Sequence, residues 1–220
     1  MTVWFTADTH FGHANILKYE SRPFKDVSAM DAALIEAWNK VVEPGDIVYH
    51  LGDLAFLGSK EATAQLLKTL KGQIFLLRGN HDRDIEKHKA RFVWIKDLAE
   101  IKIPDPDGKD GIQRIVLCHY AMRTWKGSHR NTWQLYGHSH GNLSDDPNAL
   151  SMDIGYDTGV FPWSYEQVKE RMKLKVWKPV DHHRSEHEQH PTCSSCGTKL
   201  LQLDLTHWVC PTDGNTTGCS

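Results

Sequence analysis

Short apolar runs that end in polar residues dominate the first two thirds of the chain. Each run is rich in β-branched and aromatic residues and is apolar at successive positions, which is typical of strands buried on both faces of a sheet. A buried helix segment would need a longer run. The five runs cover residues 2–7, 47–51, 74–77, 115–118 and 133–136.

Two segments with helical spacing of apolar residues alternate with the first three runs. The first helix is predicted over residues 28–41, with Ser28 as its N-cap and a turn over residues 43–46 after it. The second is predicted over residues 59–71 and ends at Gly72, a residue typical of helix C-termini. Because strands and helices alternate, we expect an α/β fold with a parallel or mixed sheet. Ligands of such sheets bind at the carboxyl ends of the strands.

The second half of the chain has more strand-like segments. Residues 99–103 and 112–117 flank the sequence Pro-Asp-Pro-Asp-Gly, which predicts a hairpin. We also expect a strand over residues 151–155, a helix over 164–172 that begins with a capping box at Ser164, and a last strand over 174–177.

The composition is that of an ordinary globular protein. The chain has 220 residues, of which 40 % are hydrophobic and 25 % charged, and a formal net charge of -2. This charge provides no overall basic field for nucleic acid, although it allows a local basic groove. No apolar run approaches the ~18 residues of a membrane helix, and the first run lacks the basic leader of a signal peptide. We therefore expect a cytoplasmic protein with reduced thiols and no membrane partner.

Seven polar side chains follow the five strand-like runs. Each alone has an ordinary explanation, such as a helix cap or a buried histidine with a hydrogen-bond partner. Together they offer carboxylate, amide and imidazole ligands, which suit divalent Mn, Fe, Zn or Ni. Seven ligands are too many for one tetrahedral ion but suffice for two ions ~4 Å apart, an arrangement that promotes phosphoryl transfer. The seven are Asp8, His10, Asp53, Asn80, His119, His138 and His140.

These residues lie in five motifs that occur in a fixed order. The motifs are Asp-x-His, Gly-Asp, Gly-Asn-His-Asp, a single strand-end His, and Gly-His-x-His, and they lie within residues 8–140. The series resembles the calcineurin-like metallophosphoesterase superfamily, and in particular a group of small bacterial and phage phosphoesterases. The resemblance implies a four-layer α/β/β/α sandwich over residues 1–180.

The resemblance also implies a role for each motif residue. One metal would be held by Asp8, His10 and His140, the other by Asn80, His119 and His138, and Asp53 would bridge them. A metal-bridging hydroxide would attack phosphorus in line with the leaving oxygen. His81 would be the general acid and Asp82 would fix its ring. Mn²⁺ is the preferred ion, with Fe, Zn or Ni as alternatives.

Four further residues near the motifs are candidates for substrate contacts. His13 could touch substrate or make a structural hydrogen bond. Arg78 and Arg83 flank the Gly-Asn-His-Asp motif and could bind phosphate or form surface ion pairs. Arg123 lies in a basic and aromatic segment that could hold a nucleotide or simply pack as a loop.

The C-terminal segment has the cysteine spacing of a small zinc module. After a polar linker over residues 181–190, residues 191–220 contain Cys-x-x-Cys-Gly and a later Cys-Pro, which resemble the knuckles of a zinc ribbon. Cys193, Cys196 and Cys210 would bind a structural Zn²⁺. The fourth ligand is open. The softness of a thiolate ligand favours Cys219, the spacing of the second knuckle favours Asp213, and His207 is a third option. Unmetallated thiols are the alternative.

These patterns favour a phosphodiesterase that acts on a phosphate-ester substrate, such as a nucleotide or nucleic acid. A phosphomonoesterase is also considered, but Leu54 follows Asp53 where protein phosphatases of the superfamily have an Asp-Arg-Gly signature. A nuclease is favoured by the zinc-ribbon-like module and the basic segment. A non-catalytic scaffold is disfavoured because His81 and all seven ligands are present. The pattern makes no prediction of the oligomeric state.

Overall fold

The structure is a computed structural model that describes residues 1–178, 180, 192–198, 200–202, 207–212 and 216–218. Spatial clustering divides the chain into two compact units, Met1–Asp181 and His182–Ser220, which we describe separately. The predicted linker lies outside the described residues. No described helix has the length and hydropathy that crossing a membrane would require.

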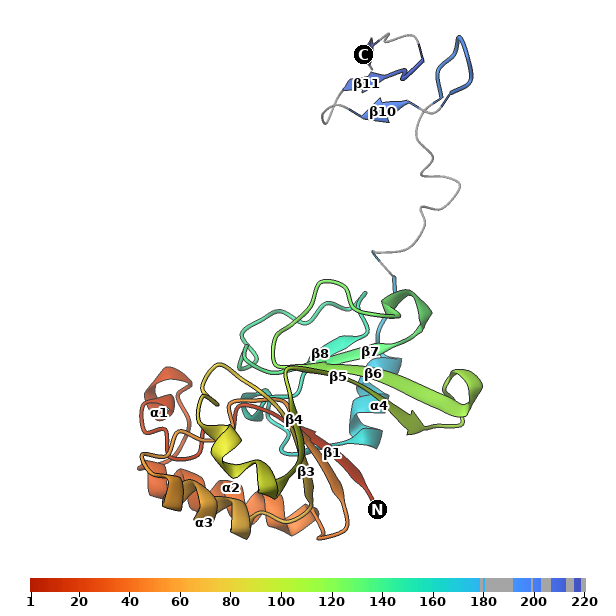
Figure 1. Cartoon of the computed structure of the whole chain (residues 1–220). Coiled ribbons are helices and arrows are strands. Elements are labelled where there is room, and N and C mark those ends of the chain that lie inside the picture. The colour runs from red at the N-terminus through yellow and green to blue at the C-terminus, as the bar shows by residue number, and fades with distance from the viewer. Residues whose placement is uncertain (179, 181–191, 199, 203–206, 213–215, 219–220) are drawn as a thin grey trace. The chain divides into compact units, whose positions relative to one another are not determined.

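The first sheet has five strands in the order β4-β3-β2-β1-β9. Its four parallel strands are β1 (Val3–Thr6), β2 (Ile47–His50), β3 (Gln73–Leu77) and β4 (Phe92–Lys96), and β9 (Trp163–Ser164) pairs antiparallel with β1. As predicted, helices alternate with the first three strands (Figure 1). These are α2 (Val27–Val41) and α3 (Lys60–Thr69), and the short α1 (Ile16–Tyr19) precedes them.

Helices α2 and α3 bury their apolar faces against the first sheet, so that Trp38 and Leu67 pack in one core with Val48. The predicted cap of α2 is wrong by two residues. Asp26, not Ser28, is the N-cap, because its extended backbone lets its carboxylate accept the Ala29 N–H at 2.8 Å. The cap of α3 is Ser59, where the predicted helix begins.

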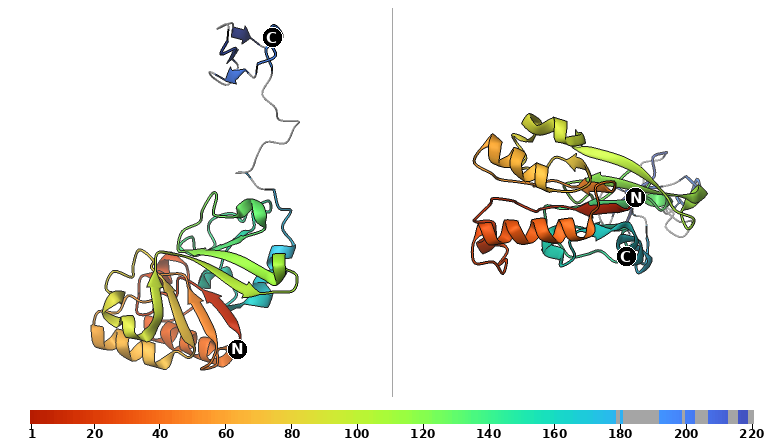
Figure 2. Two further views of the ribbon diagram at one scale, coloured as in Figure 1. Left: turned by 45° about the vertical axis from the view of Figure 1, so that its right-hand side comes forward. Right: turned by 90° about the horizontal axis from the view of Figure 1, so that it is seen from below.

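The second sheet has the order β5-β6-β7-β8. Its strands are β5 (Leu98–Pro104), β6 (Ile112–Cys118), β7 (Trp133–Tyr136) and β8 (Ser151–Asp153). Strands β5 and β6 form the predicted hairpin, whereas β6, β7 and β8 run parallel. Figure 2 shows the two sheets from two further directions.

A second apolar core joins the two sheets. It contains Phe5 from β1 and Ile115 from β6, together with Tyr165 and Met172 of α4 (Tyr165–Lys173). The predicted capping box at Ser164 opens α4. The predicted strand over 174–177 is absent, because this segment makes isolated backbone hydrogen bonds, such as that from Val176 to Pro147, instead of a ladder.

Two sheets flanked by helices confirm the predicted α/β fold class. The second unit contains a small antiparallel sheet in the order β10-β11-β12. Its strands are β10 (Leu201–Gln202), β11 (His207–Val209) and β12 (Thr216–Gly218).

Candidate dinuclear metal centre

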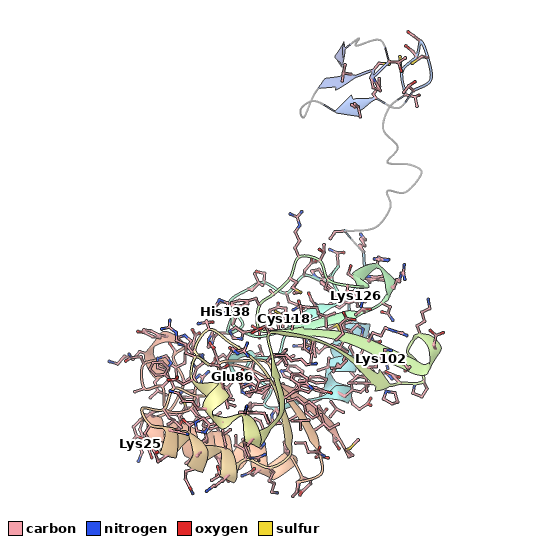
Figure 3. The ribbon with its side chains drawn as sticks, in the orientation of Figure 1. Lys25, Glu86, Lys102, Cys118, Lys126 and His138 are labelled. Atoms are coloured by element: carbon pink, nitrogen blue, oxygen red, sulfur yellow. The ribbon has the colours of Figure 1, made fainter. Side chains whose placement is uncertain are left out.

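The loops that follow the strands of both sheets meet at one place. Backbone hydrogen bonds from Asp8 to Gly52 and from His10 to Asp53, both 3.0 Å long, tie the loop after β1 to the loop after β2. The Gly137 N–H donates to the His119 carbonyl at 3.0 Å, which ties the loop after β7 to the end of β6. In Figure 3 the labels of Cys118 and His138 mark this edge of the second sheet.

The structure brings the seven predicted ligands together in two groups. Within each of two triads, ligand atoms lie within 4.8 Å of one another: Asp8, His10 and His140 form one triad, and Asp53, His119 and His138 form the other. Asn80 joins the second group, since its Oδ1 lies 3.1 Å from His119 Nε2. The structure thus brings together the residues that the family resemblance assigns to each metal, with Asp53 in the second group.

Asp53 lies between the two groups. Its Oδ2 is 3.5 Å from His10 Nε2 and 3.6 Å from His119 Nε2. Its other oxygen, Oδ1, accepts the backbone N–H of His81 at 2.9 Å. One carboxylate oxygen therefore faces a histidine of each group, a position from which it could bridge two ions.

Hydrogen bonds orient two of the imidazole rings. The Nδ1 atom of His119 lies 2.7 Å from the Leu51 carbonyl oxygen, and that of His140 lies 2.7 Å from Asp157 Oδ2. A histidine that donates from one ring nitrogen presents the other as a metal ligand. In both residues the Nε2 atom is thereby directed to the centre.

Five of the predicted ligands have a left-handed backbone. Positive φ is uncommon for residues with a side chain and costs ~1–3 kcal/mol each, so it persists where the surrounding structure imposes it. The strained backbone conformations therefore lie at the candidate site itself. The five are Asp8 (φ 56°), His10 (φ 50°), Asp53 (φ 54°), His138 (φ 66°) and His140 (φ 49°).

Close backbone approach requires glycine beside the Asp53 carboxylate and the His119 ring. A Cβ atom on Gly79 would lie 2.2 Å from Asp53 Oδ1, well inside contact distance. Gly52 combines a φ of +99° with a position where a Cβ atom would lie 2.6 Å from His119 Nδ1. The glycines of the Gly-Asp and Gly-Asn-His-Asp motifs thus make room for the ligands next to them.

The centre contains buried groups that need a compensating cation. Burial raises the pKa of Asp8 to about 7, although His140 and His119 favour its charged form. Burial lowers the pKa of His10 to about 3, although Asp53 acts in the opposite direction. The ring is therefore neutral at neutral pH and able to bind a metal. Among the described residues, no hydrogen-bond partner satisfies the buried His10 Nε2. Buried carboxylate, neutral imidazole and an unsatisfied ring nitrogen fit divalent metal ions.

Asp53 behaves differently from Asp8. Burial opposes its ionised form, but His119, the His81 N–H and His10 outweigh that effect and lower the pKa of Asp53 to about 2. The central carboxylate is therefore charged at neutral pH.

A second layer of residues that the sequence did not identify holds the first triad. Asp157 accepts hydrogen bonds from the Arg22 guanidinium as well as from His140, and Arg22 also donates to the backbone carbonyls of Asp8 and Thr9. Asp153 accepts the Gly141 N–H at 2.9 Å. No motif or local pattern marks these residues, which lie far apart in the sequence and act through long-range contacts.

His81 lies beside the first triad. Its ring centroid is 5.4 Å from that of His10 and 5.8 Å from that of His13. The described hydrogen bonds of Asp82 do not include the His81 ring, so the predicted role of Asp82 in helping to fix that ring stays a prediction. The buried Asp82 carboxylate accepts the backbone N–H groups of Asp53, Leu54 and Gly79, and so joins the loop after β2 to the loop after β3.

The four residues predicted as substrate contacts have different surroundings. His13 Nδ1 lies 3.3 Å from His10 Nδ1, next to the centre. Arg83 lines a cavity with His81. Arg78 forms ion pairs with Glu86 and Asp97, and Arg123 lines a separate cavity that includes Trp125 and Trp177.

The second unit contains a cysteine triad. The ligand atoms of Cys193, Cys196 and Cys210 lie within 4.8 Å of one another, and Cys196 Sγ is 3.5 Å from Cys210 Sγ. Cys193 and Cys210 are buried. The candidate fourth ligands Asp213 and Cys219 lie outside the described residues.

Comparison with known proteins places residues 1–157 within the model of the calcineurin-like phosphoesterase family. The uncharacterized protein MJ1445 of Methanocaldococcus jannaschii is 37 % identical over 161 residues, which cover 70 % of this chain and 81 % of that protein. The Gene 66 protein of Mycobacterium phage L5 is 30 % identical over 181 residues, which cover 70 % of this chain and 86 % of that protein. Among solved structures, the protein of unknown function AQ665 from Aquifex aeolicus has a TM-score of 0.60 and 26 % identity, covering 77 % of this chain and 98 % of that one.

Proposed function

This chain belongs to the calcineurin-like phosphoesterase family, as its motifs predicted. From that membership we propose that it is a phosphodiesterase that uses two divalent metal ions, preferably Mn²⁺. Membership and the candidate ligand groups support a metal-dependent phosphoesterase. The observation that carries the proposal is the position of Asp53 Oδ2, which faces His10 of one group and His119 of the other.

The residues divide into two sets of metal ligands with a shared carboxylate. Asp8, His10 and His140 would hold one ion, Asn80, His119 and His138 the other, and Asp53 both. When bound, two such ions supply a hydroxide nucleophile at neutral pH and stabilise the negative charge of the phosphoryl oxygens. The protein provides oriented ligands, so that little reorganisation is needed when the ions and the substrate bind.

His81 has the position of a general acid. Its ring lies beside the first triad, and its side chain is exposed to the adjoining cavity, whereas its backbone N–H is held by Asp53. A histidine so placed can donate a proton to the leaving oxygen as the ester bond breaks. The backbone hydrogen bonds that Asp82 accepts keep the loop that carries His81 against the loop that carries Asp53.

Hydrolysis of bis(4-nitrophenyl) phosphate tests this function. We expect turnover with added Mn²⁺, loss of turnover after chelation, and recovery when Mn²⁺ is restored. D53N should abolish turnover, and D97N, which alters an exposed carboxylate that pairs with Arg78, is the matched control. Wild-type turnover by D53N, or turnover of monoesters alone by the Mn²⁺-loaded protein, would contradict the proposal.

A nuclease is the second candidate because of one surface feature. The exposed side of strands β5 and β6 carries a groove of about 600 Å³ whose lining includes Lys102, Arg114, Lys126 and Arg130. Such a groove can follow a phosphate backbone. Single- and double-stranded DNA and RNA in the same Mn²⁺ assay distinguish a nuclease from an enzyme for small diesters.

The cysteine triad is proposed to bind one structural Zn²⁺. Three sulfurs within 4.8 Å of one another match the ligand type of closed zinc sites, which have four ligands. A reducing cytoplasm would keep these thiols free of disulfides. Metal analysis should find one zinc per chain, lost in C193S, whereas in C118S, which alters a buried cysteine outside the triad, the zinc should remain.

A further inference from the structure

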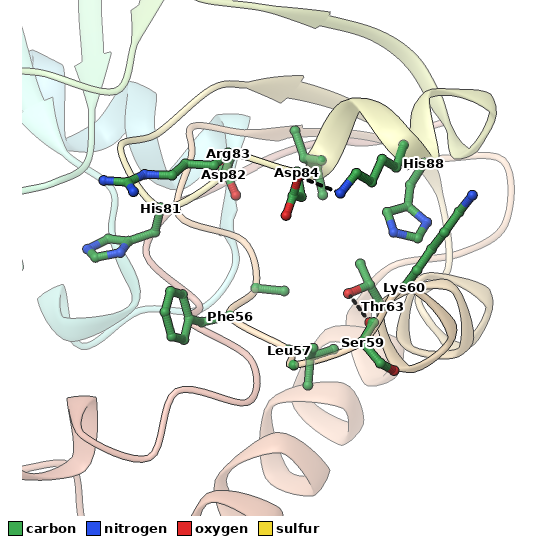
Figure 4. Close-up of a pocket in the computed structure, with 14 residues that line it drawn as sticks. Phe56, Leu57, Ser59, Lys60, Thr63, His81, Asp82, Arg83, Asp84 and His88 are labelled. Carbon is green, nitrogen blue, oxygen red and sulfur yellow. Dashed lines mark hydrogen bonds and ion pairs between the residues drawn. The ribbon is translucent and has the colours of Figure 1, made fainter.

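A cavity of about 410 Å³ opens beside His81. Its lining comes from two segments: residues 55–63, which include the start of α3, and residues 81–88. Figure 4 shows His81 and Phe56 at one end of this cavity and Lys60 and His88 at the other. The volume is in the range of small-molecule binding sites, ~300–1,000 Å³.

The end near His81 offers an aromatic surface. Phe56 is 55 % exposed, although its ring contacts those of His13 and His81 at centroid distances of 5.0 and 5.9 Å. Leu57 and the buried Ile85 add further apolar lining. An exposed phenylalanine next to a polar centre is costly in water and suits a flat ring that stacks on it.

The far end of the cavity is cationic. Lys60, Lys87 and His88 all line it, and Lys60 and Lys87 together help to lower the pKa of His88, after the larger effect of burial. In the described parts of the chain, no side chain forms a hydrogen bond or ion pair with the Lys60 ammonium.

The two carboxylates of the cavity cancel only part of this charge. Asp84 pairs with Lys87 at 2.7 Å. Asp82 faces backbone N–H groups, from which it accepts three hydrogen bonds. Among the described residues, Lys60 and Arg83 are therefore the cations of the cavity wall that have no ion-pair partner.

We propose that this cavity is the leaving-group subsite, and that it takes a nucleotide whose base stacks on Phe56 and whose terminal phosphate binds Lys60. This inference rests on the proposed phosphodiesterase function and specifies its substrate class as a short oligonucleotide with a phosphorylated end. Water would add to phosphorus as the bond from phosphorus to the leaving oxygen breaks, so that one product carries the new phosphate monoester. The other product would leave with its hydroxyl protonated and its terminal phosphate unchanged.

Three forms of dithymidylate test the subsite: unphosphorylated, 5′-phosphorylated and 3′-phosphorylated. We expect one phosphorylated form to have a kcat/KM about 5- to 10-fold above that of the unphosphorylated form, as one charge-assisted contact provides. K60A should remove this preference and K60E should reverse it. K68A, which removes an exposed lysine of the same helix outside the cavity, should retain it.

A second variant separates the ring contact from the charge contact. F56A should raise KM for all three forms by a similar factor, because stacking does not depend on the terminal phosphate. If the wild type hydrolyses bis(4-nitrophenyl) phosphate but treats the three forms alike or hydrolyses none of them, the subsite is wrong and the proposed function stands. If the Mn²⁺-loaded wild type hydrolyses no diester at all, the proposed function fails, and the subsite with it.

Discussion

Arg22 binds Asp157 through two hydrogen bonds of 2.9 and 2.7 Å, although 135 positions separate them in the sequence. Asp157 also lies 2.7 Å from His140 Nδ1, so the guanidinium fixes a proposed metal ligand through an intermediate carboxylate. The side chain of Arg22 is 1 % exposed. A bidentate pair of this kind restricts the orientation of the carboxylate, and hence that of the histidine ring.

R22K should therefore weaken one metal site and spare the other. Lysine keeps the charge but cannot form the two parallel hydrogen bonds. We expect Mn²⁺ affinity at the Asp8–His10–His140 site to fall about 10- to 100-fold, with D157N giving a similar loss. Titration with Mn²⁺ measures the affinity of this site directly.

R91K is the matched control for R22K. Arg91 also binds backbone carbonyls, those of Leu67 and Leu70, but lies away from the centre. Equal weakening by R91K would indicate general destabilisation instead.

Substitution of His138 and substitution of His140 should each remove the metal ion from a different position. The two residues lie in different triads although one residue separates them. H138A and H140A should each bind one Mn²⁺ tightly. Combination with N80A then assigns the positions: H138A with N80A should still bind one ion, whereas H140A with N80A should bind none. Metal analysis after gel filtration supplies the counts, and the same count in both double variants would contradict the assignment.

His81 should matter most when the leaving group needs a proton. An alkoxide leaving group requires protonation, so H81A should lower kcat for dithymidylate by about 10²- to 10³-fold. 4-Nitrophenolate leaves without a proton, and we expect less than a tenfold loss with bis(4-nitrophenyl) phosphate. Metal content should be unchanged, because His81 belongs to neither triad. An equal loss on both substrates would remove the general-acid role.

Most of the strands, and the grouping of the candidate metal ligands, were predictable because both leave local patterns, whereas β4 and β9 were not predicted. The hairpin of β5 and β6 and the Ser164 capping box were visible as turn and cap residues within a few positions. Likewise, the motifs place each ligand directly after a strand, where the topology of parallel strands brings them together.

Features that depend on distant contacts were not predictable. Nothing near Arg22 indicates that its partner is Asp157, and nothing in the Gly-Asn-His-Asp motif indicates that the Asp82 carboxylate binds backbone N–H groups. The cap of α2 illustrates a smaller difference: Asp26 and Ser28 are both good cap residues, and the backbone conformation before the helix decides between them.

Asp105 links the β5–β6 turn to α4 and should contribute a pH-dependent part of the stability. Its buried carboxylate accepts hydrogen bonds from Tyr165 and, at 2.7 Å, from Lys169. Burial opposes the charged form, but these two partners outweigh it and hold the pKa of Asp105 below its usual range. A carboxyl group whose folded pKa is lowered stabilises the protein above its unfolded pKa, and this contribution is lost as the pH falls through the folded value.

D105N should therefore lower the free energy of unfolding by about 2 kcal/mol at pH 7, the size expected for losing hydrogen bonds to a charged group. The difference from the wild type should shrink as the pH falls below ~4, where the unfolded chain begins to bind the proton. Denaturant unfolding at a series of pH values between 7 and 3 measures it. D107N is the control, because Asp107 pairs with the same lysine at 2.8 Å but is 67 % exposed, so its effect should be below ~1 kcal/mol. A difference between D105N and the wild type that is independent of pH would show that the lost stability comes from packing and not from the charge of Asp105.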